Sequence, residues 1–412
     1  MQATQAKKIL LISSGQPSLN PRLVKEADTL SAAGYNVTVL YSYWNDWGTT
    51  LDKELIASKK WNAIRVGGHP REKPLTYFFS RLIHKMAKYS FNRLGIKSLA
   101  DLSIARSSYF LVREAKRHEA DLYIGHNLGA LPAVVKTAKA HNKPCGFDAE
   151  DFHRYELSDD KHSLDVILKA HLEDKYIPKL DYLSTSSPLI ANEYSRIYPE
   201  KNSLVFLNTF PKMEVARSAR SEHTTIKLFW FSQTIGLKRG IEDVINALLL
   251  LPDDHFELHL LGNVTEYIRD IFIRQLKCKT SVVHFHGPIP PDQIIAFASQ
   301  FDIGLALESA FSINNDLALS NKIFSYLQAG MAIVVSDTKS QRQFLYQHPF
   351  IGKIYPKGNF RVLADILLSY YNDRDELLRT RKASYELAKD KLNWEIESEK
   401  FLSIVKQVLI QN

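Results

Sequence analysis

The chain has 412 residues, of which 45% are hydrophobic and 24% are charged, and its formal net charge is +8. This length exceeds what one hydrophobic core usually organises, and the composition is that of an ordinary globular protein, so we expect two domains. Two distant cysteines, Cys145 and Cys278, and no run of about 20 apolar residues argue against a disulfide scaffold and a membrane-spanning protein, and they predict a cytoplasmic protein.

Strand and helix signals alternate through the first half of the chain. Asn20 and Pro21 predict the start of a helix, because asparagine caps helix N-termini and proline is favoured at the first helical position, and Gly34 predicts its end. Short apolar runs predict strands at residues 9–13, 37–41, 122–126, 146–148, 183–186 and 204–207. This alternation predicts a doubly wound parallel sheet.

Basic and aromatic residues gather between Arg71 and Arg117. Three interpretations fit such a stretch: a solvated helix face with a buried apolar side, contact with an anionic membrane surface, and a nucleic-acid patch. We favour the solvated face, with peripheral attachment to the inner face of a membrane as the second interpretation. Because no recognised nucleic-acid motif accompanies the stretch, we expect no nucleic-acid partner.

Two polar segments follow strands of this first predicted sheet. His126 ends one strand, and Glu150 and Asp151 follow the next. A histidine there can donate a hydrogen bond to a sugar hydroxyl or act as a polar catalyst, and the carboxylates can supply a base and substrate contacts. The alternatives are structural: a buried histidine, and acids that pair with Arg154 or cap the next helix.

The pattern breaks at a polar stretch, residues 213–225, which we interpret as a linker. Strand signals resume at residues 227–231, 256–261, 282–285, 303–307 and 332–336, and the chain from about residue 360 onward is predicted to be helical. We expect a first domain at 1–210, a second at 211–393, and a helix at about 394–412 that packs back on the first domain. Ligands of such domains bind outside the carboxyl ends of the strands.

The first strand of the second half runs into a glycine-bearing loop that ends at a helix start near residue 241. Gly236 and Gly240 allow backbone conformations and close approaches that other residues resist. Arg239 offers a planar fork of donors to phosphate oxygens. We expect a phosphate contact here; the alternative is a plain strand–helix connection with exposed basic side chains.

A second anion site is expected at the start of a short helix, where Ser320, Asn321 and Lys322 follow a polar loop. A helix start offers unpaired N–H groups and the positive end of a dipole, and Lys322 adds a full positive charge. Gly330 is expected to end the helix, and apolar residues at helical spacing should bury its opposite face. The alternative is a capped core helix whose lysine points into water.

Three further positions follow predicted strands of the second half: Gly262, Ile289 and Glu308. The proline-rich loop around Ile289 can present backbone groups to a nucleobase edge, and Glu308 can accept a hydrogen bond from a ribose or sugar hydroxyl. A simple turn at Gly262 and an ordinary surface glutamate at 308 are the alternatives.

A metal site is not expected. Asp373 and Asp375 have the spacing of a sugar-nucleotide metal motif, but an N-cap followed by an acidic first helical turn explains them better. Without a metal ion, the negative charge of a departing pyrophosphate would be stabilised by the protein's own cations and by a helix start. The first strand is not followed by G-x-G-x-x-G, so we expect no nicotinamide cofactor either.

Taken in order, several segments resemble the GT-B glycosyltransferases, in particular the large retaining family 4 (glycosyl transferases group 1). The likeness covers nearly the whole chain. Its motifs are an Arg-x-x-x-Glu-Ala pattern at 22–27, DLYIGHNLGALPAV at 121–134, FDAEDFHRYE at 147–156, SQTIGLKRGIEDVINAL at 232–248 and ALSNKIFSYLQAGMAIVVSD at 318–337.

The resemblance implies an α/β protein with two Rossmann-like, doubly wound parallel-sheet domains that face a central cleft. It implies that His126 contacts the donor sugar, that Arg239 contacts phosphate, and that Gln233 and Gly236 belong to the donor loop. The 318–337 segment resembles the donor-binding helix of the branch with Asn-Lys at its start.

The family commonly carries two glutamates separated by seven residues in this last region. Leu317 and Ser325 occupy those positions here. This departure weakens the transfer of sugar-hydroxyl contacts to the helix, but it leaves the phosphate site at Lys322 in place.

We therefore predict a metal-independent, retaining glycosyltransferase that moves a sugar from a nucleotide-diphosphate sugar to a glycan or lipid-linked acceptor in bacterial-type polysaccharide or glycoconjugate synthesis. A UDP-sugar is our guess for the co-substrate, and no other cofactor is expected. The alternatives are a non-catalytic nucleotide-sugar or glycan binding protein on the same fold, suggested by the missing glutamates, and a sugar-nucleotide epimerase.

Overall fold

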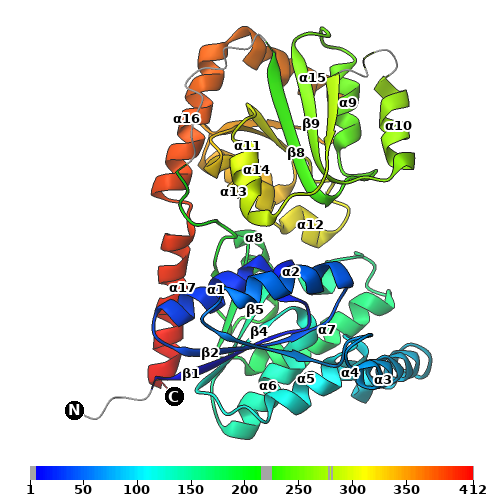
Figure 1. The fold of residues 1–412 in the computed structure, drawn as a ribbon, viewed down its shortest axis with the longest axis vertical. Helices are drawn as coiled ribbons and strands as arrows, with labels where there is room; N and C mark the ends of the chain where they lie inside the picture. Colours follow the sequence, from blue (N-terminus) through cyan, green and yellow to red (C-terminus); the bar gives the residue numbers. More distant parts are fainter. Residues whose placement is uncertain (1–5, 215–224, 277–278, 280–281, 412) are drawn as a thin grey trace. The chain divides into compact units, whose positions relative to one another are not determined.

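The structure of the protein is a computed structural model that describes residues 6–214, 225–276, 279 and 282–411. Most of the predicted linker and Cys278 therefore lie outside the described residues. The chain divides into two compact units, whose elements are labelled in Figure 1. The first unit comprises Met1–Phe206, Ser312–Asn314 and Ser398–Asn412, and the second comprises Leu207–Phe311 and Asn315–Glu397.

The first unit contains a seven-stranded sheet in the order β3-β2-β1-β4-β5-β6-β7, with parallel pairing throughout. Its strands are β1 Lys8–Ser13, β2 Asn36–Ser42, β3 Asn62–Val66, β4 Leu122–His126, β5 Cys145–Glu150, β6 Tyr182–Thr185 and β7 Ser203–Val205. The strand order reverses at β1, so the prediction of a doubly wound parallel sheet is confirmed. The pattern missed β3, because Asn62 and Arg65 interrupt the apolar run of this edge strand.

Helices connect the strands of the first unit. They are α1 Pro21–Ala32, α2 Asp46–Ala57, α3 Pro74–Leu94, α4 Ala100–Ser103, α5 Ser108–Ala115, α6 Leu131–His141, α7 Leu164–Tyr176 and α8 Pro188–Ile197. Short 3-10 turns lie at Pro17–Leu19, Lys97–Leu99, Leu128–Ala130, His153–Tyr155 and Ile177–Lys179. The predicted start of α1 is confirmed, since the Asn20 side chain accepts a hydrogen bond from the Leu23 amide at 3.0 Å.

The last helix, α17 Trp394–Gln411, contributes its final residues to the first unit. Phe401 and Val405 are buried in the same hydrophobic cluster as Leu11 of β1 and Leu23 of α1. The rings of Phe401 and Phe206 meet edge to face at 5.9 Å. The C-terminal helix α17 therefore covers one side of the first sheet, although it is the segment farthest in sequence from β1.

The second unit contains a six-stranded parallel sheet in the order β10-β9-β8-β11-β12-β13. Its strands are β8 Ile226–Thr234, β9 Phe256–Asn263, β10 Val283–His286, β11 Ile303–Ala306, β12 Ala332–Ser336 and β13 Gly352–Tyr355. The predicted strands are confirmed, and the pattern missed only β13, a four-residue edge strand that begins with glycine.

Helices again alternate with these strands. They are α9 Ile241–Leu248, α10 Glu266–Leu276, α11 Ile294–Ala298, α12 Ile313–Leu317, α13 Asn321–Gln328, α14 Lys339–Gln347, α15 Phe360–Asn372 and α16 Arg374–Asp390, and a 3-10 turn lies at Pro291–Gln293. The Asp373 side chain caps α16 by accepting from the Glu376 amide at 2.7 Å, which confirms the structural interpretation of that acidic segment.

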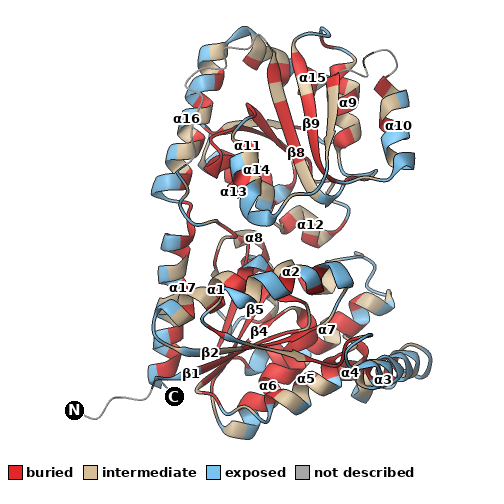
Figure 2. Cartoon of the chain, viewed as in Figure 1, coloured by how far each residue is buried: buried red, intermediate tan, exposed pale blue. Residues whose placement is uncertain are grey.

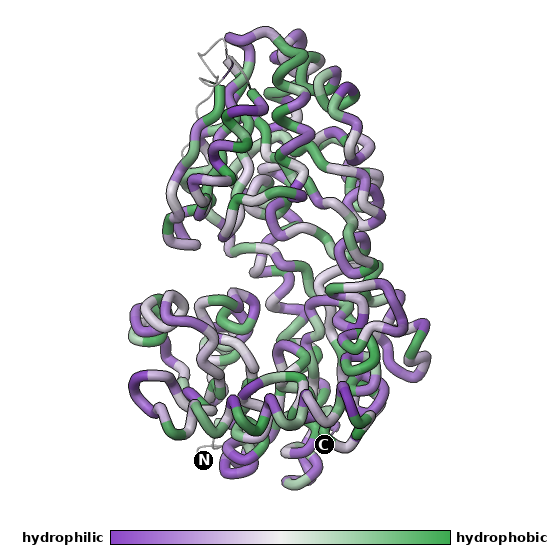
Figure 3. The backbone as a smooth tube through the Cα atoms, turned by 90° about the vertical axis from the view of Figure 1, so that its right-hand side faces the viewer, coloured by the Kyte–Doolittle hydropathy of each residue, from purple (hydrophilic) through white to green (hydrophobic). Residues whose placement is uncertain are grey.

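Buried residues concentrate on the strands and on the inward sides of the helices (Figure 2). In the second unit they form two clusters, one centred on Trp230 and Leu260 and the other on Phe229 and Tyr326. Hydrophobic and hydrophilic stretches alternate along the chain (Figure 3), as amphipathic helices and buried strands require. Among the described residues, no helix combines the length and the apolar character needed to cross a bilayer.

Candidate functional site

Two glycines near the carboxyl ends of β8 and β9 in the second unit are closely packed by neighbouring segments. A Cβ at Gly262 would lie 2.2 Å from the Ser232 carbonyl oxygen, and one at Gly240 would lie 2.6 Å from Leu307 Cβ. Both glycines also have positive φ angles, 146° and 79°. Only glycine fits at these positions, so they fix how the loop carrying Arg239 leaves the sheet.

Arg239 is exposed at the end of this loop, immediately before α9. One of its guanidinium nitrogens donates to the Ser232 hydroxyl at 2.8 Å. Its guanidinium carbon lies 5.9 Å from the centre of the Trp230 ring, within the range of a cation–π contact. Arg239 is thus held at the carboxyl end of β8 while its remaining donors face solvent.

Lys322, in the first turn of α13, lies beside the same tryptophan. Its ammonium nitrogen is 5.7 Å from the centre of the Trp230 ring and 2.8 Å from a carboxylate oxygen of Glu308. The structure therefore brings together the two cations that the sequence places in separate loops. Trp230 was not singled out from the sequence, because its position within a buried strand predicts only a core residue.

Glu308 follows β11 and organises the start of α13. It accepts hydrogen bonds from the Ser320 hydroxyl at 2.7 Å and from Lys322, with Asn315 Nδ2 at 3.5 Å. Burial alone would raise the pKa of Glu308, but Lys322 and Ser320 outweigh burial and lower that pKa to about 2. Because the Ser320 hydroxyl is directed to Glu308, it does not cap the N–H groups of α13.

The low pKa of Glu308 predicts a distinct acid response. A carboxylate whose pKa is depressed stabilises the folded state above its ordinary pKa, and that stability is lost as pH falls through its folded pKa. Between about pH 4.5 and pH 2, the second unit of the wild-type protein should lose stability more steeply than that of Glu308→Gln. Hydrogen exchange of β11 and α13 peptides at both pH values measures this; parallel pH profiles would contradict it.

The rest of α13 matches its prediction. Ile323, Phe324 and Leu327 are buried, and the amides of Gly330 and Met331 close the helix end by donating to Leu327 and Tyr326 carbonyls at 3.0 Å. The first turn, with the exposed Asn321 and the partly buried Lys322, is therefore the part of this short helix that the predicted anion contact can use.

The remaining donor-loop predictions stay predictions. Gln233 is exposed at the end of β8, and Gly236 has open space around its Cα. Ile289 is half-buried and packs against the cluster around Phe229, so its side chain has a packing role, while its backbone contact with a base stays untested.

In the first unit, His126 belongs to a buried cluster of charged side chains. Its Nε2 lies 3.1 Å from Glu26, its Nδ1 lies 3.6 Å from Asp148, and Arg22 pairs with both of these carboxylates. All four residues are about 1% exposed. Burial alone would lower the pKa of His126, but the two carboxylates outweigh burial and raise it. The structure thus encloses His126, and its contact with a donor sugar stays a prediction without support from this geometry.

Glu150 and Asp151 lie at the carboxyl end of β5, as predicted. Glu150 has a positive φ of 55°, a strained value for a non-glycine residue. The Asp151 carboxylate accepts from Asn314 Nδ2 at 3.0 Å, and the side-chain oxygen Oδ1 of Asn314 accepts from the Phe152 amide at 2.7 Å. Burial raises the pKa of Asp151. Arg154 pairs with Glu173 and Asp174 at 2.6 and 2.7 Å.

Asp151 lies in the wall of a cavity of about 940 Å³ in the first unit. Loops that follow β1, β2 and β4 contribute Ser14, Tyr43 and Asn127, and helices α3 and α7 contribute several basic side chains. Arg106, from the basic and aromatic stretch between Arg71 and Arg117, also lines the cavity, and so does Lys169, which the sequence did not single out because one lysine in an amphipathic helix gives no signal of its own.

Two groups of side chains among the described residues have donor atoms close enough to share a metal ion. They are Glu26, His126 and Asp148 in the first unit, and Glu257, His259 and His284 in the second. Both carboxylates of the first group already pair with Arg22. The expectation of a metal-independent protein stays a prediction.

Known structures resemble this chain over nearly its full length. Sucrose-phosphate synthase from Thermosynechococcus elongatus has a TM-score of 0.68 at 14% identity, covering 98% of this chain and 100% of its own. HepE from Anabaena in complex with UDP and glucose has a TM-score of 0.67 at 15% identity, covering 97% and 100%. WaaG, a glycosyltransferase involved in lipopolysaccharide biosynthesis, has a TM-score of 0.62 at 13% identity, covering 95% and 98%.

These similarities confirm the predicted GT-B fold, with its two parallel-sheet α/β domains. Comparison with models of protein families and with curated protein sequences finds no match.

Proposed function

We propose that the protein is a glycosyltransferase whose second unit binds a nucleotide-diphosphate sugar. One observation carries this proposal: Arg239 and Lys322 converge on Trp230 at the carboxyl edge of the second sheet. Two cations beside an exposed loop suit a ligand with two adjacent phosphates. Structures of HepE, which shares this fold, contain UDP and UDP-glucose, and this supports a UDP-sugar as the donor.

The proposed mechanism uses the protein's own positive charges. As the bond between sugar and diphosphate breaks, negative charge grows on the diphosphate, and Arg239 and Lys322 stabilise it without a metal ion. Glu308 acts as a positioning residue, because its carboxylate holds the Lys322 ammonium at 2.8 Å. Retention of the anomeric configuration is part of the proposal and derives from the resemblance to family 4.

The acceptor is proposed to be a glycan or a lipid-linked glycan of bacterial-type polysaccharide synthesis, bound in the cavity of the first unit. Asp151 is the candidate for contact with the acceptor hydroxyl, because it lies in the cavity wall and burial raises its pKa. A carboxylate whose pKa is raised is a stronger proton acceptor than an ordinary one.

A transfer assay with a panel of nucleotide sugars and glycan acceptors tests this proposal. We expect the release of nucleotide diphosphate to depend on both donor and acceptor. Donor binding without turnover across all acceptors would favour a non-catalytic binding protein. Conversion of the donor without any acceptor, followed by NMR, would favour an epimerase.

A further inference from the structure

Helix α3 presents an apolar stripe to solvent. Leu75, Phe78 and Met86 are 75%, 62% and 63% exposed. Together with three more exposed residues they recur at helical spacing along one side of the helix: Leu75, Phe78, Phe79, Leu82, Met86 and Tyr89. At 1.5 Å per residue this stripe is about 20 Å long. Exposed apolar surface of this extent marks an interaction site.

The charge of α3 identifies the kind of partner. The helix contains Arg81, Lys85, Lys88 and Arg93 and no acidic residue over Pro74–Leu94. An apolar stripe on a helix that carries basic and no acidic side chains complements an anionic lipid surface, whose headgroups are negative and whose interior is apolar.

A second side of α3 faces the cavity of the first unit. The α3 side chains that line the cavity include Arg81, His84, Lys85, Lys88 and Asn92. They recur at helical spacing, as the apolar stripe does, but on a neighbouring side of the helix. Arg81, Lys85 and Lys88 form no ion pair with any carboxylate in the described part of the chain. Lys85 and Lys88 are therefore available to an anion, whereas Arg81 already donates to the Tyr77 hydroxyl at 3.4 Å and its guanidinium carbon lies 5.7 Å from the centre of the Tyr77 ring.

The other cations of the cavity are already engaged. Lys169 pairs with Glu156 and Asp165, both at 3.1 Å. Arg106 donates to the Tyr43 carbonyl oxygen at 2.9 Å, and its guanidinium carbon lies 4.6 Å from the centre of the Tyr77 ring. The positive charge that a ligand can use therefore lies on the α3 side of the cavity.

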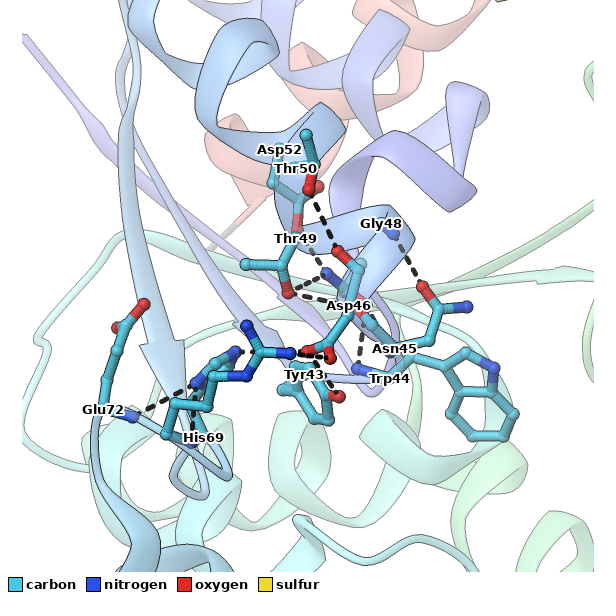
Figure 4. A network of polar contacts seen from close by, with 12 residues as sticks. Tyr43, Trp44, Asn45, Asp46, Gly48, Thr49, Thr50, Asp52, His69 and Glu72 are labelled. Atoms are coloured by element: carbon cyan, nitrogen blue, oxygen red, sulfur yellow. Dashed lines mark hydrogen bonds and ion pairs between the residues drawn. The ribbon is translucent and has the colours of Figure 1, made fainter.

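The loop after β2 forms a further part of the wall and is held by hydrogen bonds and ring contacts. Figure 4 shows the Asn45 side chain directed at the Gly48 amide, at 2.6 Å, and the Trp44 indole pointing away from this network. The Tyr43 ring packs edge to face on His69 at 4.7 Å. Trp44, which is 73% exposed, thus adds an apolar side chain to the cavity rim.

We propose that this cavity binds the phosphate-bearing head of a membrane lipid, with the lipid chain following the apolar stripe of α3 into the bilayer. This inference rests on the proposed function and names its acceptor class: a lipid-phosphate-linked glycan rather than a free oligosaccharide. The phosphate contacts Lys85 and Lys88, and the glycan extends toward Asp151 in the same cavity.

Sedimentation of the 412-residue chain with lipid vesicles tests the inference. The probes are phosphatidylcholine vesicles with and without phosphatidic acid, whose headgroup is a bare phosphate. We expect binding at low salt only when phosphatidic acid is present, and weaker binding as salt rises, because the charges are screened. Lys85→Ala/Lys88→Ala should weaken binding roughly thirtyfold, or about fivefold for each charge removed.

Phe78→Ser/Phe79→Ser should weaken binding at least as much, since these rings no longer enter the bilayer. Matched controls in the second unit are Lys382→Ala/Lys389→Ala and the exposed Phe350→Ser, which should bind vesicles as the wild type does. Equal binding by all variants would overturn the inference, and so would concentration-dependent dimerisation that Phe78→Ser/Phe79→Ser abolishes.

A parallel measurement of UDP binding keeps the two proposals separate. Loss of vesicle binding with unchanged UDP binding is expected for the α3 variants. If wild-type protein binds UDP but no vesicles, the lipid inference fails while the donor proposal stands. If it binds vesicles but no UDP, the donor proposal fails.

Discussion

Replacing Arg239 or Lys322 with alanine should each lower kcat of sugar transfer by about 100- to 1,000-fold. This is the effect of removing one preorganised group that stabilises charge in a transition state. The effect should appear mainly in kcat, because the charge on the diphosphate grows as the sugar leaves. Both side chains meet at Trp230, so the double variant should lose less than the product of the two single effects.

Matched controls separate charge from folding in this experiment. Lys357→Ala removes an exposed lysine of the second unit and should leave kcat unchanged. Lys322→Arg keeps the charge and should retain more activity than Lys322→Ala. Unaltered turnover in Arg239→Ala and Lys322→Ala, with Tm values like that of the wild type, would contradict the assignment.

Replacing Arg22 with methionine should destabilise the first unit by about 3–5 kcal/mol. Arg22 is 1% exposed and pairs with Asp148 and Glu26, so its loss leaves buried carboxylates without this counter-charge. Methionine keeps much of the side-chain volume, so the loss reports charge rather than a cavity. Hydrogen exchange of β4 and β5 peptides measures the stability of this unit separately from that of the second.

Arg196→Met is the control for that change. Arg196 is 70% exposed in its pair with Glu193, and an exposed ion pair contributes less than about 1 kcal/mol. The exchange rates of β4 and β5 are compared among Arg22→Met, Arg196→Met and the wild type. Equal rates in all three would show that the cluster around His126 does not stabilise the unit.

Much of the fold could be predicted from the sequence because the buried parallel strands are continuous apolar runs. The strand around Ile303 and the helix that follows Asn20 are examples, since each has its own local signal. The edge strands β3 and β13 escaped prediction because one is interrupted by polar residues and the other begins with glycine. Their place is set by pairing with β2 and β12 rather than by local pattern.

The sequence identified the candidate site residues one at a time, but it did not show which of them lie together in the fold. Arg239 follows a strand end and Lys322 lies at a helix start, and these positions identify them as candidates. Both side chains contact Trp230, which lies about 90 residues before Lys322 in the sequence, and Glu308, which holds Lys322, lies 14 residues before it. No local sequence pattern specifies these contacts. His126 shows the converse case, since the same strand-end signal leads to a buried charge cluster.

Calorimetric titration of the protein with UDP and with uridine tests the central claim most directly. If Arg239 and Lys322 form a diphosphate site, UDP should bind at least about 100-fold more tightly than uridine, because each charge-assisted contact contributes about 1.5–3 kcal/mol. Arg239→Ala/Lys322→Ala should reduce UDP affinity to that of uridine. Equal affinities of the wild-type protein for UDP and uridine would contradict the account.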